Sequence, residues 1–262
     1  CLSALFGVTD FPVAGERGNQ PSPRCDRDSM TDLYVGTSGY NYKQWKGSFY
    51  PEKISDKQML DFYGEQFRSV EINNSFYRVP KPEVVQGWAE RVPASFRFVL
   101  KSTRRITHIK RLKQVEEDVA YFTGIANELG DRLGAVLFQL PANFRKDMER
   151  LQVFVDLLRT RLPAAMEFRH DSWFDDEVRA CLNARNIALC FAHEDDDTDI
   201  EVEQRFHSTA DWGYLRLRGT GYDDEQMTGW ARKVEAESWT RAFVFFKHED
   251  EGLSETGKNL YS

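Results

Sequence analysis

Short apolar runs alternate along the chain with longer segments whose apolar residues recur at helical spacing. This alternation indicates repeated strand–helix units and a parallel sheet. Eight of the short runs have the length and composition of buried strands. The predicted strands are Leu33–Thr37, Ser69–Ile72, Phe96–Leu100, Gly134–Leu140, Ala164–Phe168, Ile187–Phe191, Gly213–Leu217 and Ala242–Phe246.

The segments between these strands carry apolar residues on one helical face. In the segment Val119–Leu129 the apolar residues follow this spacing, and Pro163 ends another helical segment before the fifth strand. Eight strands with intervening helices predict a single α/β domain, a (β/α)₈ barrel of the TIM type, with a doubly wound open sheet as the alternative. No G-x-G-x-x-G or G-x-x-x-x-G-K-[ST] motif follows a strand, which favours the barrel.

The chain has 262 residues, a length typical of one such barrel. Residues 1–29 differ from the rest, because they carry Pro12, Pro21 and Pro23 and show no sustained apolar period. We interpret them as a poorly ordered leader, either native or derived from outside the protein. Met30 follows directly, so the expected organisation is a leader over 1–29 and one barrel domain over 30–262.

The formal net charge is −7, with 35 Lys and Arg residues against 42 Asp and Glu residues. This balance disfavours a broad electrostatic contact with nucleic acid but is compatible with a local basic patch. No run of about 18 apolar residues occurs, so no membrane contact is expected. The N-terminus lacks a secretory pattern and no C-x-x-C pair occurs, so we expect free thiols and a cytoplasmic location.

Polar residues follow the predicted strands at their carboxyl ends, where barrel enzymes carry their sites. Residues two apart on a strand point to the same side, so Glu71 and Asn73 share a face and the apolar Ile72 takes the other. Two further pairs follow the same alternation: Glu167 with Arg169, and Arg216 with Arg218. An unpaired charge inside a barrel is costly, so we expect the glutamates to pair with these arginines or with Lys101 around a cavity.

The residues at these strand ends resemble the motifs of the YecE-like family (domain of unknown function 72). The resemblance rests on Gly36–Tyr40 with Trp45, Gly47 and Phe49–Pro51, on Glu71–Tyr77, on Lys101 with Ile106–His108, on Leu137–Pro141, on Glu167–His170 with Ser172 and Trp173, and on Tyr214–Gly219. It extends from about Leu33 to the end of the chain and implies a TIM-type barrel, without supplying an activity. Phe246–Glu249 departs from the F-N-N-x-x-x-G pattern common in the family, so no role is predicted for Lys247–Glu249.

Three residues are candidates for catalysis. Glu71 and Glu167 suit an acid/base pair, because neighbouring charges can separate the pKa values of two carboxyl groups. The alternative is that both are buried ion-pair partners of the arginines. His170 is a candidate proton shuttle, or a structural histidine at a strand end.

A larger set is predicted to bind a ligand. Guanidinium and ammonium groups suit phosphate or carboxylate, amides supply neutral hydrogen bonds, and aromatic rings stack on a sugar or a base. For the cations the alternative is internal pairing, and for the aromatic residues it is packing. The set is Asn73, Tyr77, Lys101, His108, Gln139, Arg169, Trp173, Arg216 and Arg218.

No motif implies a cofactor. A divalent metal held by Glu71, Glu167 and His170 is a lesser alternative, because neither H-x-H nor H-E-x-x-H spacing occurs. We interpret the acidic run His193–Asp199 as a solvated loop and Cys190 as inert core.

Three functions remain open from the sequence. The first is an enzyme, hydrolase-like or isomerase-like, acting on a small polar and anionic molecule that is phosphorylated or sugar-like. The second is a barrel that binds or cleaves nucleic acid, favoured by the basic and aromatic residues and opposed by the net charge. The third is a non-catalytic ligand-binding protein. The sequence leaves the oligomeric state open.

Overall fold

The computed structural model describes residues 31–158, 162–195 and 197–247. The predicted leader over 1–29 therefore lies outside the described residues, as do His248 and Glu249. Within the described part, every strand pairing is parallel and the sheet has the order β6-β5-β4-β3-β2-β1-β9-β8-β7. The strands are β1 (Asp32–Ser38), β2 (Ser69–Ile72), β3 (Arg97–Lys101), β4 (Leu133–Gln139), β5 (Ala164–Glu167), β6 (Ala188–Leu189), β7 (Phe191–His193), β8 (Trp212–Leu217) and β9 (Arg241–Phe246).

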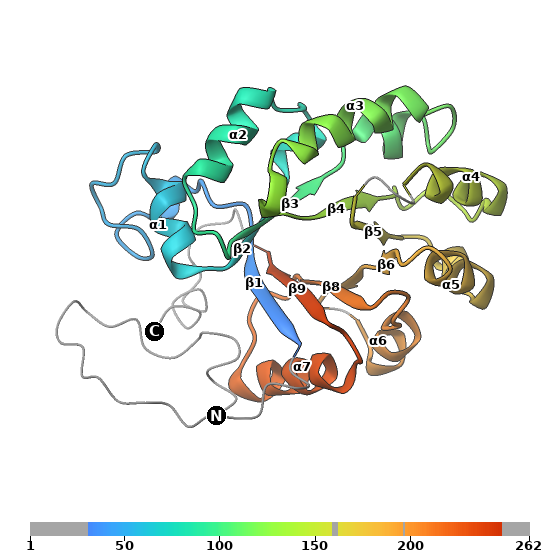
Figure 1. The fold of residues 1–262 in the computed structure, drawn as a ribbon. Coiled ribbons are helices and arrows are strands. Elements are labelled where there is room, and N and C mark those ends of the chain that lie inside the picture. Colours follow the sequence, from blue (N-terminus) through green and yellow to red (C-terminus); the bar gives the residue numbers. More distant parts are fainter. Residues whose placement is uncertain (1–30, 159–161, 196, 248–262) are drawn as a thin grey trace.

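Helices follow the strands and surround them, so the predicted barrel is confirmed (Figure 1). Two of these helices, α2 and α6, were not predicted. The acidic run interpreted as a solvated loop leads instead into α6, because Thr198 and Glu201 form a reciprocal capping box at its start. The α-helices are α1 (Met59–Gln66), α2 (Pro82–Glu90), α3 (Glu116–Asn127), α4 (Met148–Leu158), α5 (Asp176–Asn183), α6 (Asp199–Arg205) and α7 (Asp224–Ala236).

The sixth predicted strand is divided in two at Cys190. Its first part, β6, pairs with β5, and its second part, β7, pairs with β8. Between these pairings the Cys190 N–H donates to the carbonyl oxygen of Met166 at 2.8 Å. The buried Thr209 hydroxyl lies 2.8 Å from the Leu189 nitrogen and 2.7 Å from the Ile187 carbonyl oxygen. One side chain thus satisfies backbone groups of β6 that have no strand partner on that side, and the barrel closes along this seam.

Side chains alternate between the barrel interior and the outer layer beneath the helices, as the strand pleat requires. The outer-facing residues of β2–β6 pack with α1–α5, and those of β7–β9, together with Leu33 of β1, pack with α6 and α7. The interior holds a separate apolar cluster that ends where the charged residues begin. It consists of Tyr34, Val99, Ala135, Leu137, Ala165, Ala188, Cys190, Trp212, Tyr214, Phe243 and Phe245.

No helix among the described residues is long and apolar enough to cross a membrane. Of the four cysteines, Cys181 and Cys190 lie within the described part of the chain, and both are buried free thiols.

Candidate functional site

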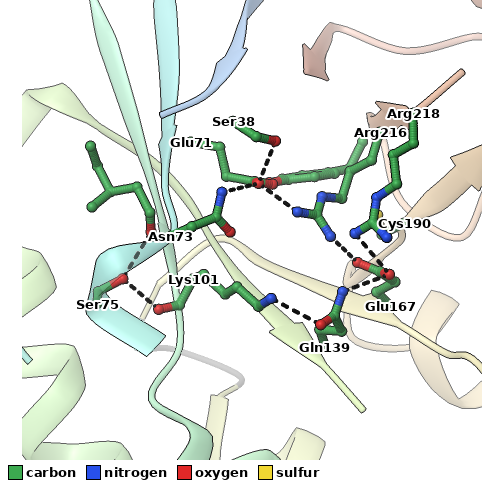
Figure 2. Close-up of polar contacts among 12 residues, drawn as sticks. Ser38, Glu71, Asn73, Ser75, Lys101, Gln139, Glu167, Cys190, Arg216 and Arg218 are labelled. Atoms are coloured by element: carbon green, nitrogen blue, oxygen red, sulfur yellow. Dashed lines mark hydrogen bonds and ion pairs between the residues drawn. The ribbon is translucent and has the colours of Figure 1, made fainter. Parts of the chain in front are cut away.

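The polar residues at the carboxyl ends of the strands form one hydrogen-bonded network above the apolar interior (Figure 2). We call Glu71, Glu167 and Arg216 the inner tier, because their side chains are 0%, 0% and 5% exposed. We call Lys101, Arg169, Arg218 and Glu194 the outer tier. The predicted inward orientation of the strand-end charges is therefore what the structure shows.

Glu71 lies at the centre of one side of the network. Its Oε1 accepts hydrogen bonds from the Ser38 hydroxyl at 2.9 Å, the Asn73 amide at 3.0 Å and Arg216 Nη2 at 2.7 Å. Its Oε2 accepts from the Tyr214 hydroxyl at 2.6 Å. Burial, and next the charge of Glu71, raise the pKa of Tyr214 well above its ordinary value, so this hydroxyl remains a donor. Four donors on a fully covered carboxylate hold it in one orientation.

Glu167 is held in the same way from the opposite side of the barrel. Its Oε1 accepts from the Gln139 amide at 2.8 Å, Arg169 Nε at 2.9 Å and Arg218 Nη2 at 3.5 Å. Its Oε2 accepts from Arg216 Nη1 at 2.7 Å. Three guanidinium groups therefore face one buried carboxylate.

Arg216 joins the two glutamates, one through each terminal nitrogen. Burial alone would lower the pKa of Arg216, but the charges of Glu71 and Glu167 outweigh it and hold the pKa above its ordinary value. The remaining nitrogen, Nε, is buried and has no hydrogen-bond partner among the residues that the structure describes. Removing one member of such a buried group leaves an uncompensated charge, so the inner tier depends on all three residues being present.

The turn after β2 positions the part of the network that lies at the ends of β2 and β3. Ser75, in the 3₁₀ turn η2 (Asn74–Phe76), lies 2.9 Å from the Ile72 carbonyl oxygen and 2.6 Å from the Lys101 carbonyl oxygen (Figure 2). One buried hydroxyl thus joins the ends of β2 and β3. This contact fixes the distance between the carboxylate side of the network and the start of the Lys101 side chain.

Lys101 extends from the end of β3 to Gln139 at the end of the neighbouring strand β4 (Figure 2). Its Nζ donates to the Gln139 amide oxygen at 2.9 Å and lies 4.5 Å from the centroid of the Phe76 ring. Desolvation by burial, and next the positive charge of Arg216, lower the pKa of Lys101 below its ordinary value. This amine therefore loses its proton more readily than a solvated lysine does.

Glu194 is the accessible carboxyl group of the network. It follows β7, its side chain is 40% exposed, and it accepts from Arg218 Nη1 at 2.9 Å. Arg169 Nη2 lies 3.8 Å from the same carboxylate. Burial, and next the charge of Glu167, raise the pKa of Glu194.

The segment after β3 forms a π-helical turn, η3 (Arg105–Ile109), which brings His108 beside the network. The His108 ring meets the Phe76 ring edge-on at 4.8 Å, and its Nδ1 lies 2.9 Å from the Thr107 hydroxyl. Burial, and next the charge of Lys101, lower the pKa of His108, which favours the neutral ring. Arg111 and Leu112 follow with φ angles of 48° and 64°. π-helical turns and left-handed non-glycine residues are both enriched at functional sites.

Three predicted residues lie apart from the network. His170 accepts a hydrogen bond from the Ser172 N–H at 3.1 Å and caps the 3₁₀ turn η5 (Asp171–Trp173). Trp173 was predicted to contact ligand, but it is 1% exposed, stacks on Phe168 at 4.7 Å and belongs to the outer layer, so no face of its ring is open. Tyr77 is 72% exposed at the rim and contacts the described network only through Phe76.

The lesser alternative of a metal held by Glu71, Glu167 and His170 has no matching geometry. Within residues 31–158, 162–195 and 197–247, no three His, Cys, Asp or Glu side chains are arranged to hold a metal ion.

Three residues of the network were not among the predicted site residues. Tyr214 and Ser38 could have been found from the strand alternation, because Tyr214 lies two positions before Arg216 and Ser38 two positions after Gly36. Glu194 was hidden in an acidic run, where composition indicates solvation and gives no sign that one carboxylate turns inward.

The fold and the network define a (β/α)₈-barrel protein with a charged site at the carboxyl ends of its strands. The chain belongs to the family described as "Protein of unknown function DUF72", which matches residues 34–256. This confirms the family that the sequence motifs indicated.

Individual relatives agree with this assignment. The chain is 30% identical over 143 residues to the UPF0759 protein YecE of Escherichia coli (strain K12), a match that covers 54% of this chain and only half, 50%, of YecE. It is 22% identical over 240 residues to the UPF0759 protein YunF of Bacillus subtilis (strain 168), covering 87% of this chain and 83% of YunF. The crystal structure of a DUF72 family protein from Thermotoga maritima matches with a TM-score of 0.71 at 26% identity, over 88% of this chain and 96% of that one.

Proposed function

We propose that the barrel mouth binds a small anionic molecule, phosphorylated or carboxylated, and that the protein is a hydrolase-like or isomerase-like enzyme acting on it. The observation that carries this proposal is the charge balance of the network. Four cations, Lys101, Arg169, Arg216 and Arg218, face three carboxylates, those of Glu71, Glu167 and Glu194. The site is thus locally cationic in a chain whose net charge is −7, and a partly desolvated excess of cations attracts an anion.

The position of the outer tier supports the same proposal. Arg218 follows β8, which is the seventh strand of the barrel when β6 and β7 are taken as the two parts of one. Phosphate sites in TIM barrels often use the loops after the seventh and eighth strands, which is support by analogy with the fold. Arg218 is 13% exposed and Arg169 is 35% exposed, so both guanidinium groups are reachable from the mouth.

Among the acidic groups, Glu194 suits acid/base chemistry best. It is exposed enough to meet a ligand, and its raised pKa brings it nearer to neutrality. His108 has a neutral ring beside the same mouth and suits proton transfer as well. The predicted acid/base role of Glu71 and Glu167 has less support, because each already accepts four hydrogen bonds away from solvent. For His170 the geometry favours capping.

The test is calorimetric titration with inorganic phosphate at low ionic strength, on the wild type and on Arg218→Ala. We expect the variant to bind about tenfold to a hundredfold more weakly, because a charge-assisted hydrogen bond is worth about 1.5–3 kcal/mol. The matched control is Arg179→Ala on α5, whose guanidinium pairs with the exposed Asp176 instead of with a residue of the network. Equal affinity in wild type and Arg218→Ala would contradict the anion site. Binding without turnover of any bound compound would support the non-catalytic alternative.

One observation favours a second function, binding of single-stranded nucleic acid. The segment after β3 carries the exposed cations Arg104 and Lys113, and the exposed apolar side chains Ile109 and Tyr77 lie near it on the same rim. Basic and aromatic groups together suit a backbone with stacked bases. A salt-dependent oligonucleotide affinity that is lost in Arg104→Ala and kept in Arg218→Ala would support this function over the first.

A further inference from the structure

Lys101 is surrounded differently from Lys146, another lysine at this face of the barrel. Its Nζ donates to a neutral amide oxygen, and within the described residues it makes no ion pair with a carboxylate. Lys146, in the loop after β4, contacts both Asp175 and Glu177. Lys101 is therefore a buried amine whose positive charge is poorly compensated, and Lys146 is an amine fixed in its charged form.

The charged groups that face Lys101 come from several strands. Arg216 of β8 repels the ammonium form, whereas Glu167 of β5 and Glu71 of β2 stabilise it more weakly. Cys190 is buried, and burial raises the pKa of its thiol well above the ordinary value, so it supplies no thiolate. Desolvation together with Arg216 therefore lowers the pKa of Lys101, despite the opposing charges of Glu167 and Glu71.

A second titratable group lies close to this amine. Lys101 Nζ and the His108 ring both lie within 5 Å of the Phe76 ring centroid, at 4.5 Å and 4.8 Å. His108 Nδ1 is engaged by Thr107, which leaves Nε2 as the nitrogen available to a bound molecule. The arrangement thus combines a desolvated amine, a neutral imidazole and, across the mouth, the guanidinium groups of Arg169 and Arg218.

We propose that Lys101 is a nucleophile that forms a Schiff base with a small aldehyde or ketone carrying an anionic group. The amine nitrogen attacks the carbonyl carbon, and the C–N bond forms as the carbonyl oxygen becomes a hydroxyl. His108 carries one N–H proton from the nitrogen to that oxygen, which gives the carbinolamine. It then carries the second N–H proton to the hydroxyl, the C–O bond breaks, water leaves and the imine C=N bond remains. The inference rests on the proposed function, because the outer-tier arginines hold the anionic group of the same substrate.

The test uses pyridoxal 5′-phosphate, an aldehyde with a phosphate group, followed by borohydride reduction and peptide mapping of the full chain. Because the pKa of Lys101 is lowered and that of Lys146 is raised, a larger fraction of Lys101 is unprotonated at a given pH, so Lys101 should be labelled faster than Lys146. Lys101→Arg, which keeps the charge but forms no stable imine, should lose this label. Lys146→Met should keep it, and circular dichroism with a thermal melt verifies that each variant is folded.

A second probe separates this inference from the proposed function. Pyridoxine 5′-phosphate carries the phosphate but no aldehyde, so its affinity reports the anion site alone. If it binds the wild type and loses affinity in Arg218→Ala while Lys101 is labelled no faster than Lys146, the nucleophile is refuted and the anion site stands. If Lys101 is labelled selectively and equally by pyridoxal with and without phosphate, the nucleophile stands and the anion site is refuted. If neither probe responds, both proposals are refuted.

Discussion

The inner and outer tiers contain the same kinds of ionic side chains but differ in how far these are buried. The carboxylates of Glu71 and Glu167 are 0% exposed, whereas that of Glu194 is 40% exposed. Arg216 bridges two fully buried carboxylates, and Arg218 bridges one buried and one partly exposed carboxylate. The two tiers differ in the hydrogen bonds that their groups can still form. Each inner carboxylate already accepts four hydrogen bonds, whereas the outer groups are partly exposed and can form further ones. Burial therefore separates residues that maintain the barrel mouth from those that are exposed at it.

The largest expected effect follows from breaking the inner tier. Arg216→Met leaves two buried carboxylates without their shared cation, so the free energy of unfolding should fall by about 3–5 kcal/mol. Arg218→Met should cost about 1–2 kcal/mol, because Glu167 keeps its other donors and Glu194 is partly solvated. Urea unfolding of both variants measures the difference. Equal losses would show that the two tiers are one energetic unit.

In the outer tier we expect a smaller effect, which is a gain in phosphate affinity instead of a loss of stability. Glu194→Gln removes the carboxylate that competes with an anion for Arg218 and Arg169, so phosphate affinity should rise by up to about tenfold. Calorimetric titration at low salt measures this change, and the gain should shrink as ionic strength rises. The unfolding free energy should change by less than about 1 kcal/mol, as for other partly exposed pairs. Weaker phosphate binding in this variant would mean that Glu194 orients the arginines instead of competing for them.

The smallest effect is a pH dependence that distinguishes Lys101 from Lys146. Because the pKa of Lys101 is lowered on folding, the unfolded chain binds more protons between the folded value and the ordinary value of 10.5. Wild-type stability should therefore rise relative to Lys101→Met as the pH increases through that window. The pKa of Lys146 is raised by its hydrogen bond to Asp175, so the stability it contributes is present below 10.5 and is lost only above it.

Urea unfolding from about pH 7 to about pH 9.5 measures both variants against the wild type. The difference between wild type and Lys101→Met should change over this range, and the difference for Lys146→Met should stay constant. Constant differences for both would mean that Lys101 titrates as a solvated lysine does.

The fold could be predicted from the sequence because parallel strands are covered on both faces and therefore read as apolar runs. The division of the sixth strand at Cys190 could not, because Ile187–Phe191 is apolar whichever neighbour it pairs with. Helix α2 could have been predicted, because Pro82 stands at its start and Val84, Val85 and Trp88 recur at helical spacing. Helix α6 is stabilised at its start by a cap within an acidic run.

The inward charges of the site could be predicted from the two-residue period of the strands, but their environments could not. Both Trp173 and Tyr77 follow strand ends in recognisable motifs, yet one is covered by Phe168 and the other faces solvent. The sequence likewise shows that Glu71 and Glu194 are acidic, but it does not indicate that Glu71 accepts four hydrogen bonds or that Glu194 is partly exposed to solvent. Such distinctions arise from residues distant in the chain, such as Tyr214 on Glu71.

The seam at Cys190 has a consequence for how the barrel fluctuates. Among the described residues, β1–β5, β8 and β9 each pair with a strand on both sides, but β6 pairs with β5 alone and β7 with β8 alone, and on its other side β6 has the single hydroxyl of Thr209. Local opening in a closed barrel begins where the fewest backbone bonds must break together. Deuterium from solvent should therefore enter the amide of Leu189 before those of β1 and β9. Local opening of the barrel should begin at β6, between β5 and β8.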